Sequence, residues 1–208
     1  MKKVIIIDTG RANFLSIKRA VEKYEKNVLI SNEEQEIKSA TKIILPGVGA
    51  FKDGVNYLKK KNIFNTIKKI SKDKPIMGIC LGMQLLFENS NEHGPCEGLD
   101  LMNGKIRPLP RAKDNTFKIP NIGWYNLIVT DEYKNTKISN LILDDFYFIH
   151  SFYATDIKKE NLVAYYNFGD LKVPAIVKNE NILGCQFHPE KSRFPGLNLI
   201  NKFLNNQL

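Results

Sequence analysis

The segment Pro75-Ile-Met-Gly-Ile-Cys-Leu-Gly-Met-Gln84 decides the fold class. Its first half is an apolar run typical of a strand buried on both faces, and the stretch 81–89 predicts a helix. Cys80 would therefore lie at a sharp strand-to-helix turn, which exposes the side chain at its apex. Gly78 and Gly82 stand two residues to either side. Small residues are needed there because the chain segments crowd together at such a turn.

The rest of the chain extends this pattern in both directions. Strands are expected at residues 4–7, 28–30, 42–45 and 75–79, and helices at about 17–24 and 51–71. Further strands are expected at 101–106, 124–129, 146–153, 162–168, 175–178 and 182–187, before a helix at about 197–204. Strand–helix alternation predicts a parallel sheet, and the short later connections predict antiparallel pairs. We therefore expect residues 1–208 to form one α/β domain, with an open, mixed, mostly parallel sheet and helices on both faces.

Composition excludes several classes of protein. Apolar residues make up 43% and charged residues 25%, and no apolar run approaches the roughly 20 residues of a membrane helix. We expect a cytoplasmic protein with no membrane contact. The net charge is +9, but the lysines are dispersed, and those at 59–74 fit the solvated face of an amphipathic helix. This pattern argues against nucleic-acid binding. The three cysteines have no disulfide or metal spacing, so we expect neither a metal nor another cofactor.

A second motif, Gly184-Cys-Gln-Phe-His-Pro-Glu190, ends a later apolar strand. In an extended segment His188 and Glu190 point to the same side, so the carboxylate could orient the imidazole. Most buried cysteines only pack, and a lone His and Glu are common in surface turns. The combination with a cysteine at a sharp turn favours instead a Cys80–His188–Glu190 triad assembled in space. The backbone N–H of Leu81 would then be available to bind an oxyanion.

Two further features allow more than one interpretation. Pro46-Gly-Val-Gly49 follows a strand and could present backbone amides to a ligand, but it could equally be a plain turn. It lacks the Gly-Lys-Ser/Thr of a phosphate-binding loop. His150 lies in an aromatic-rich strand and fits a hydrogen-bonded core histidine as well as a substrate contact.

Together, Gly-Ile-Cys80-Leu-Gly-Met-Gln and Gln-Phe-His188-Pro-Glu-Lys-Ser resemble the two motifs of class I (triad-type) glutamine amidotransferases. Within that family the chain is most similar to the glutaminase subunits of imidazole glycerol phosphate synthase. The segments that support this resemblance are 8–16, 46–51, 80–87, 98–99, 119–124, 150–153 and 188–192.

The resemblance implies a role for each matching residue. Cys80, His188 and Glu190 would form the catalytic triad, and the amides of Gly49 and Leu81 an oxyanion hole armed by a peptide flip near Val48. The residues that would hold glutamine are Gly49, Gln84, Glu92, Ser151 and Phe152. Those near the partner interface or the ammonia exit would be Asn13, Trp124, Tyr147 and Lys191. The implied partner is a (β/α)8-barrel cyclase/synthase subunit in a heterodimer, and no cofactor is implied.

The sequence departs from the family pattern outside the triad. Asn121 stands where histidine is usual, Tyr125 where asparagine is usual, and Phe152 where tyrosine is commoner. Arg193 replaces a small residue. Since some of these lie on the expected partner side, two destinations for the ammonia stay open. One is imidazole glycerol phosphate and AICAR formation in histidine biosynthesis. The other is the formation of amidino groups on surface sugars, served by a paralogous glutaminase.

Overall fold

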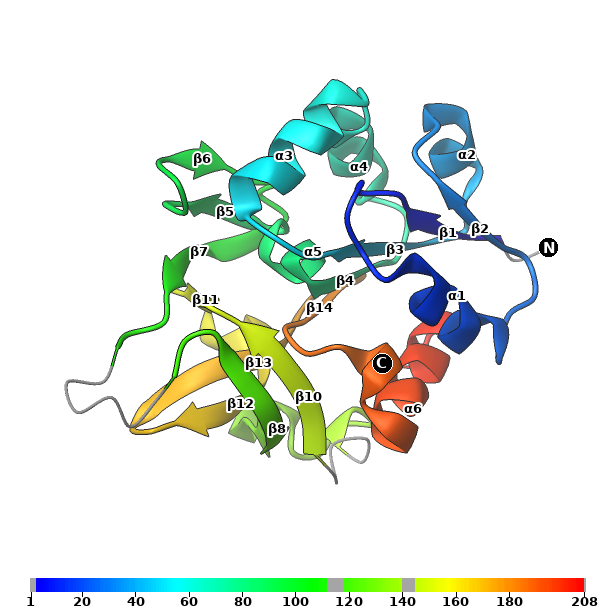
Figure 1. The fold of residues 1–208 in the computed structure, drawn as a ribbon. Coiled ribbons are helices and arrows are strands. Elements are labelled where there is room, and N and C mark those ends of the chain that lie inside the picture. The colour runs from blue at the N-terminus through cyan, green and yellow to red at the C-terminus, as the bar shows by residue number, and fades with distance from the viewer. Residues whose placement is uncertain (1–2, 112–117, 140–144, 208) are drawn as a thin grey trace.

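The structure is a computed structural model that describes residues 3–111, 118–139 and 145–207. Its largest element is an eight-stranded sheet in the order β2-β1-β3-β4-β14-β13-β12-β9 (Figure 1). In that order the strands are Val28–Ser31, Val4–Ile7, Lys42–Gly47, Ile76–Cys80, Ile182–Cys185, Leu171–Asn179, Leu162–Phe168 and Ile128–Val129. The strands from β2 to β14 are parallel, and β13, β12 and β9 continue the sheet in antiparallel pairs. The expected open, mixed, mostly parallel sheet is confirmed.

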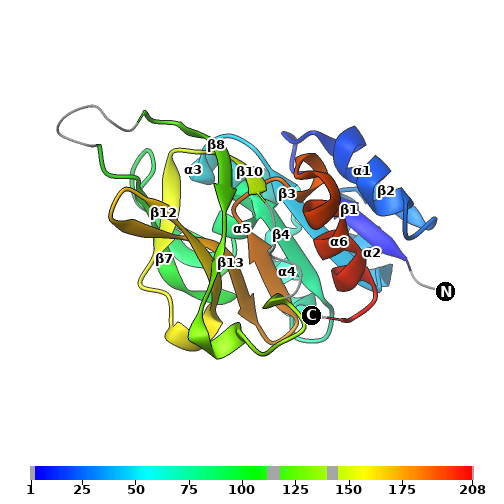
Figure 2. The ribbon, with the colours of Figure 1, turned by 90° about the horizontal axis from the view of Figure 1, so that it is seen from below.

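Helices cover both faces of this sheet, as expected. One face carries α1 (Phe14–Glu22) and α6 (Arg193–Leu204), which lie in front of β1 in Figure 2. The other carries α2 (Glu34–Ser39), α3 (Phe51–Lys60) and α4 (Phe64–Ile70). Alternation along β1 explains the two layers: Val4 and Ile6 pack in the cluster that includes α1 and α6, while Ile5 and Ile7 pack with α2 to α4. No helix in the described residues is long and apolar enough to cross a membrane.

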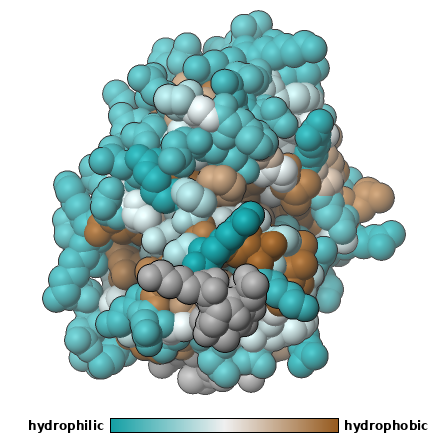
Figure 3. Space-filling model, turned by 60° about the vertical axis from the view of Figure 1, so that its left-hand side comes forward, coloured by the Kyte–Doolittle hydropathy of each residue, from teal (hydrophilic) through white to brown (hydrophobic). Residues whose placement is uncertain are grey.

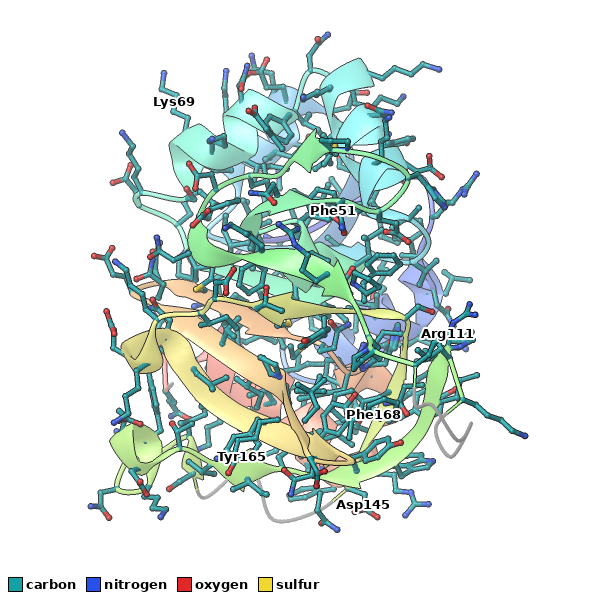
Figure 4. All side chains as sticks on the ribbon, turned by 90° about the vertical axis from the view of Figure 1, so that its left-hand side faces the viewer. Phe51, Lys69, Arg111, Asp145, Tyr165 and Phe168 are labelled. Carbon is teal, nitrogen blue, oxygen red and sulfur yellow. The ribbon has the colours of Figure 1, made fainter. Side chains whose placement is uncertain are left out.

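The lysine-rich segment forms a solvated surface. In Figure 4, Lys69 points away from the molecule while Phe51 points inward from α3. The upper part of the surface in Figure 3, where α3 and α4 lie, is largely hydrophilic. The prediction of a single helix over 51–71 was wrong, because the chain breaks between α3 and α4. Asn62 adopts a left-handed conformation there (φ 59°), which ends α3.

Two smaller sheets contain strands that the sequence analysis placed wrongly. One pairs β10 (Asp145–His150) with β8 (Asn121–Asn126), and the other has the order β11 (Phe152–Thr155), β7 (Met102–Pro108), β5 (Phe87–Ser90) and β6 (Cys96–Glu97). The predicted single strand 146–153 is broken at Ser151, because its halves pair with β8 and β7 in different sheets. The predicted strand 124–129 is likewise divided between β8 and β9.

The helix predicted over 81–89 is also much shorter. Helix α5 spans Leu81–Gln84, and β5 begins at Phe87. Phe87 is fully buried and pairs in parallel with Met102 of β7. Tertiary pairing has therefore overridden the helical pattern of the last residues.

Candidate active site

Three neighbouring strands bring the main sequence motifs to one edge of the sheet. Strands β3, β4 and β14 lie side by side and run parallel (Figure 1). Gly47 pairs with Cys80, and Cys185 pairs with Ile79. Because the carboxyl ends of parallel strands meet at the same edge, the segments that follow them also meet there. The Val48–Gly49 turn, Cys80 and His188 are thus brought together.

Cys80 occupies the sharp turn that the glycines predict. Its backbone has φ 54° and ψ −112°, a conformation that non-glycine residues rarely adopt. A Cβ on Gly78 would lie 2.8 Å from the backbone of Met83, and one on Gly82 would lie 1.7 Å from the carbonyl oxygen of Leu45. Both glycines are therefore required by the close approach of the chain. Because α5 has only four residues, its dipole is small and can add little stabilisation to negative charge at Cys80.

His188 and Glu190 form a buried pair beside this turn. His188 Nδ1 donates to Glu190 Oε1 over 2.9 Å, and the Glu190 side chain is fully buried. Glu190 lies in a 3-10 turn, η4 (Pro189–Lys191), so the predicted extended geometry was wrong although the two side chains do meet. His188 Nε2 is buried and has no hydrogen-bond partner among the described residues. That nitrogen is available to a substrate or to the sulfur.

The charges around His188 favour its protonated form. Burial lowers the pKa of His188, but Cys80 and Glu190 together outweigh burial and raise it to about 10. The imidazolium is therefore the dominant form at neutral pH. A protonated imidazole is the counter-ion that a thiolate at Cys80 requires.

A cavity of about 330 Å³ is lined by the Val48–Gly49 turn, Cys80 and His188. Its volume falls within the roughly 300–1,000 Å³ typical of small-molecule sites. The wall includes nine residues that the sequence analysis selected: Val48, Gly49, Cys80, Leu81, Gln84, Glu92, Ser151, Phe152 and His188. Three more residues, which it had not selected for the site, are Pro120, Ile149 and His150. Ile149 to Phe152 reach the cavity because the chain bends at Ser151, where β10 ends.

Several of the cavity residues already have hydrogen-bond partners. The N–H of Val48 donates to the carbonyl oxygen of Arg11 at 3.0 Å. Glu92 Oε2 accepts the N–H of Phe51 at 2.6 Å, at the start of α3. These contacts hold the Val48–Gly49 turn and the Glu92 carboxylate in place at the cavity wall.

The residues expected near a partner surface divide into two groups. Trp124 and Tyr147 have ring centroids 5.6 Å apart, and Lys191 Nζ lies 5.7 Å from the Tyr147 ring centroid. The guanidinium of Arg193 lies 4.7 Å from the Trp124 ring centroid. Asn13 instead caps α1, accepting the N–H of Ser16, and none of the described contacts joins it to this aromatic cluster.

The sequence alone left the role of His150 undecided between a core histidine and a substrate contact, and no role was predicted for Gln186. Burial lowers the pKa of His150 to about 4, so its ring is neutral at pH 7. The ring bonds the Phe152 carbonyl oxygen and the Tyr166 hydroxyl, both at 2.8 Å. Gln186 Nε2 lies 3.9 Å from Cys80 Sγ. Its position two residues before His188 was the available signal.

The unusual residues Asn121 and Tyr125 contact each other. The Tyr125 hydroxyl donates to Asn121 Oδ1 over 2.6 Å, and Asn121 Nδ2 donates to the Tyr166 hydroxyl over 2.8 Å. The Tyr125 ring lies against Gly123, where a Cβ would be 3.1 Å from it. In the described part of the chain, no cluster of His, Cys, Asp and Glu suits a metal ion.

Comparison with known proteins places this geometry in a family. The model of "Glutamine amidotransferase class-I" matches residues 5–206. The chain belongs to the class I glutamine amidotransferases. It is 40% identical to imidazole glycerol phosphate synthase subunit HisH 1 of Legionella pneumophila (strain Paris), over 98% of this chain and 99% of that protein. It is 41% identical to the HisH subunit of Lactococcus lactis subsp. lactis (strain IL1403), over 98% of each chain.

Structural comparison supports the same fold. A crystal structure described as a glutamine amidotransferase superposes with a TM-score of 0.71, over 97% of this amidotransferase and 98% of that chain. The two are 15% identical in sequence. At this level of identity the likeness shows the fold alone, and the chemistry must be argued from the site.

Proposed function

We propose that this amidotransferase hydrolyses glutamine to glutamate and ammonia through a thioester on Cys80. We further propose that it is the glutaminase subunit of an imidazole glycerol phosphate synthase, with residues 1–208 forming one cytoplasmic glutaminase domain. The observation that carries the chemistry is the meeting of Cys80 with the His188–Glu190 pair at one cavity, where His188 Nε2 is buried and has no hydrogen-bond partner among the described residues. The HisH relatives, similar over their full length, support the pathway.

In the first half-reaction the Cys80 thiolate attacks the side-chain carboxamide carbon of glutamine. The oxygen becomes negative and accepts hydrogen bonds from the amides of Leu81 and Gly49, which line the cavity. The carbon–nitrogen bond then breaks, and His188 gives its Nε2 proton to the departing nitrogen. Ammonia and a glutamyl thioester result.

In the second half-reaction His188, now neutral, takes a proton from water at Nε2. The hydroxide attacks the thioester carbon, the carbon–sulfur bond breaks, and glutamate leaves as the thiolate returns. Glu190 accepts the hydrogen bond from the Nδ1–H of His188 throughout, which keeps Nε2 directed at the reacting atoms.

Substrate binding would use the residues of the cavity wall outside the triad. The Glu92 carboxylate suits the α-ammonium of glutamine, and Gln84, Ser151 and Phe152 offer polar groups for the remainder. Val48 N–H is bound to the Arg11 carbonyl oxygen, so a peptide flip near Val48 that arms the Gly49 amide would have to change the hydrogen bonds of this turn. We therefore propose that the isolated chain is weakly active and is stimulated by its partner.

The partner would be a (β/α)8-barrel cyclase subunit that receives the ammonia. Trp124, Tyr147 and Lys191 would lie at its interface or at the ammonia exit, with Asn13 at the interface edge. The Tyr147 ring centroid is 6.5 Å from that of His188, so this cluster adjoins the triad. Ammonia must leave unprotonated to react, which favours a dry exit covered by a partner.

The test is glutamate release by the chain with and without its cognate cyclase and the cyclase's nucleotide substrate. We expect strong stimulation by the loaded cyclase and complete loss in Cys80→Ala. Cys96→Ala is the matched control, because Cys96 lies outside the cavity, and it should keep full activity. Absence of glutamate release with the loaded cyclase, or full activity in Cys80→Ala, would overturn the proposal.

The same assay separates the two possible ammonia acceptors. Asn121 bonds Tyr125, and Arg193 stacks on Trp124, so these departures from the family pattern are accommodated within the chain. They therefore give no independent support to a sugar-amidinating partner, and the HisH relatives favour the histidine pathway. Stimulation by the barrel subunit of a sugar-amidinating system, but not by the cyclase, would reverse this choice.

A further inference from the structure

A buried hydrogen-bond chain leads away from Cys80 through the side chains of Gln186 and Gln84. Gln186 is fully buried, and its Nε2 lies within hydrogen-bonding reach of the sulfur at 3.9 Å. Its Oε1 accepts a hydrogen bond from Gln84 Nε2 at 3.0 Å, and Gln84 Nε2 also donates to the carbonyl oxygen of Phe152 at 3.1 Å. The side chains of Cys80, Gln186 and Gln84 and the carbonyl of Phe152 thus form one continuous hydrogen-bond chain.

The Phe152 carbonyl fixes the direction of every bond in this chain. A carbonyl oxygen only accepts, so Gln84 must turn its nitrogen towards it. The second hydrogen of that nitrogen then goes to Gln186, which must present its oxygen to Gln84 and its NH₂ group to the sulfur. The same carbonyl accepts Nδ1–H of His150, leaving Nε2 to accept the Tyr166 hydroxyl. The orientation of Gln186 therefore follows from the geometry.

The contacts of the sulfur distinguish its two protonation states. The carbonyl oxygen of Ile149 lies 3.9 Å from Cys80 Sγ and accepts a hydrogen bond from the thiol. Gln186 offers a donor, which stabilises negative charge on the sulfur more than a neutral thiol. Loss of the thiol proton removes the bond to Ile149 and strengthens the bond from Gln186.

We propose that Gln186 is a positioning residue for the nucleophile: its N–H donates to the Cys80 sulfur, holds it beside the cavity and favours the thiolate. Gln84 orients the Gln186 amide for this purpose. The proposal rests on the proposed glutaminase function for its biological meaning. The titratable groups around the sulfur are His188, Glu190 and Cys185, and His188 supplies the positive charge. Gln186 adds a neutral donor whose direction is fixed.

The test measures the rate of Cys80 alkylation by iodoacetamide against pH. The parent carries Cys96→Ser, because Cys96 is partly exposed and would react, and the modified peptide is quantified by mass spectrometry. Gln186→Met keeps the length of the side chain but removes the donor. We expect the midpoint of its alkylation profile to move upward by about 1 pH unit, as loss of a hydrogen bond to a charged group predicts.

Cys185→Ala is the matched control. Cys185 is the neighbour of Gln186, fully buried, and its Sγ contacts the Gly78 carbonyl oxygen at 3.6 Å. This variant removes packing without removing the donor, so its midpoint should stay at the parent value. A shift in Gln186→Met equal to that in Cys185→Ala would overturn the proposal, because packing would then explain both.

A second variant keeps Gln186 and removes the residue that orients it. Gln84→Met should move the midpoint upward by less than Gln186→Met does. If Gln186→Met does not fold, an unchanged midpoint in folded Gln84→Met overturns the proposal. Alkylation does not require glutamine turnover, so a protein with the expected shifts but no glutamate release would retain this role for Gln186 and reject the proposed function.

Discussion

His188 and His150 are both buried beside the same cavity, with 5% and 6% of their surface exposed, yet their pKa values move in opposite directions. The Cys80 sulfur and the Glu190 carboxylate outweigh burial at His188 and raise its pKa to about 10. At His150 burial dominates and lowers the pKa to about 4, because its partners are a carbonyl and a phenol. Hydrogen-bond partners and nearby charges, and not depth, therefore determine which histidine carries a proton.

The two regions therefore suit different tasks. The ionic region around His188 can move a proton to and from a substrate. The neutral region around His150 holds the Phe152 carbonyl, and through it the Gln84 and Gln186 amides, in one orientation. Substitutions can convert one region towards the other or weaken the hydrogen bonds around His150.

The largest effect is expected when His188 is given a neutral partner, as His150 has. Glu190→Gln should lower the His188 pKa, and partner-stimulated glutamate release should fall by on the order of 10³-fold because the imidazolium and its orientation are both lost. NMR titration of the His188 ring and steady-state kinetics measure the two effects. Glu97→Gln, at an exposed carboxylate outside the cavity, should leave both unchanged. A full rate in Glu190→Gln would contradict the assigned role.

The pKa values of His150 and His188 shift in opposite directions, so the two residues should affect stability at opposite ends of the pH range. His150 has a lowered pKa in the fold, so its contribution to stability is lost as pH falls from about 6.5 towards 4, by roughly 3 kcal/mol. His188 has a raised pKa, so its contribution is present below about 6.5 and is lost as pH rises through about 10. Denaturant unfolding across this pH range measures the free energy of unfolding against pH. The losses at its low-pH and high-pH ends are the acid limb and the alkaline limb of that curve.

A matched pair of variants assigns the acid limb. His150→Gln should flatten the loss of stability between pH 6.5 and 4 and leave the alkaline limb unchanged. His93→Gln, at an exposed loop histidine, should change neither limb. An acid limb that persists unchanged in His150→Gln would show that another group is responsible.

The smallest effect is expected at Tyr125, which ends the hydrogen-bond network that runs from His150 through Tyr166 and Asn121. Tyr125→Phe removes the donor to Asn121 Oδ1 and leaves a buried acceptor unsatisfied, so the free energy of unfolding should fall by about 1 kcal/mol. Glutamine hydrolysis should stay close to that of the parent. Tyr133→Phe is the control, because its hydroxyl bonds the Glu160 carbonyl in an exposed position and its loss should cost less. Equal losses of unfolding free energy in the two variants would show that the contact with Asn121 stabilises the fold no more than the exposed contact with Glu160 does.

The parts of the fold that follow from short segments could be predicted from the sequence. The runs that form β1, β3, β4 and β14 are continuous and apolar, and two glycines indicate the sharp turn at Cys80. These features also bring the two main motifs to one edge, since neighbouring parallel strands end together. The meeting of Cys80 and His188 was therefore predictable although the two residues lie far apart in the sequence.

The parts that depend on distant partners were not predictable. Nothing local to residues 146–153 shows that the chain changes sheets at Ser151, because the choice is made by β8 and β7. The interpretation of His150 stayed open for a similar reason: its protonation depends on Tyr166, in another sheet, and on burial. The short α5 was missed because Phe87 finds a strand partner only in the folded chain.

In the proposed reaction Cys80 is the nucleophile that attacks glutamine. Its most direct test is covalent labelling of the partner-bound protein with a glutamine-mimicking diazo ketone, followed by peptide mass spectrometry. We expect one adduct per chain, on Cys80, with protection by excess glutamine and no adduct on Cys96 or Cys185. Labelling that persists in Cys80→Ala, or no labelling of Cys80 in the stimulated complex, would contradict it.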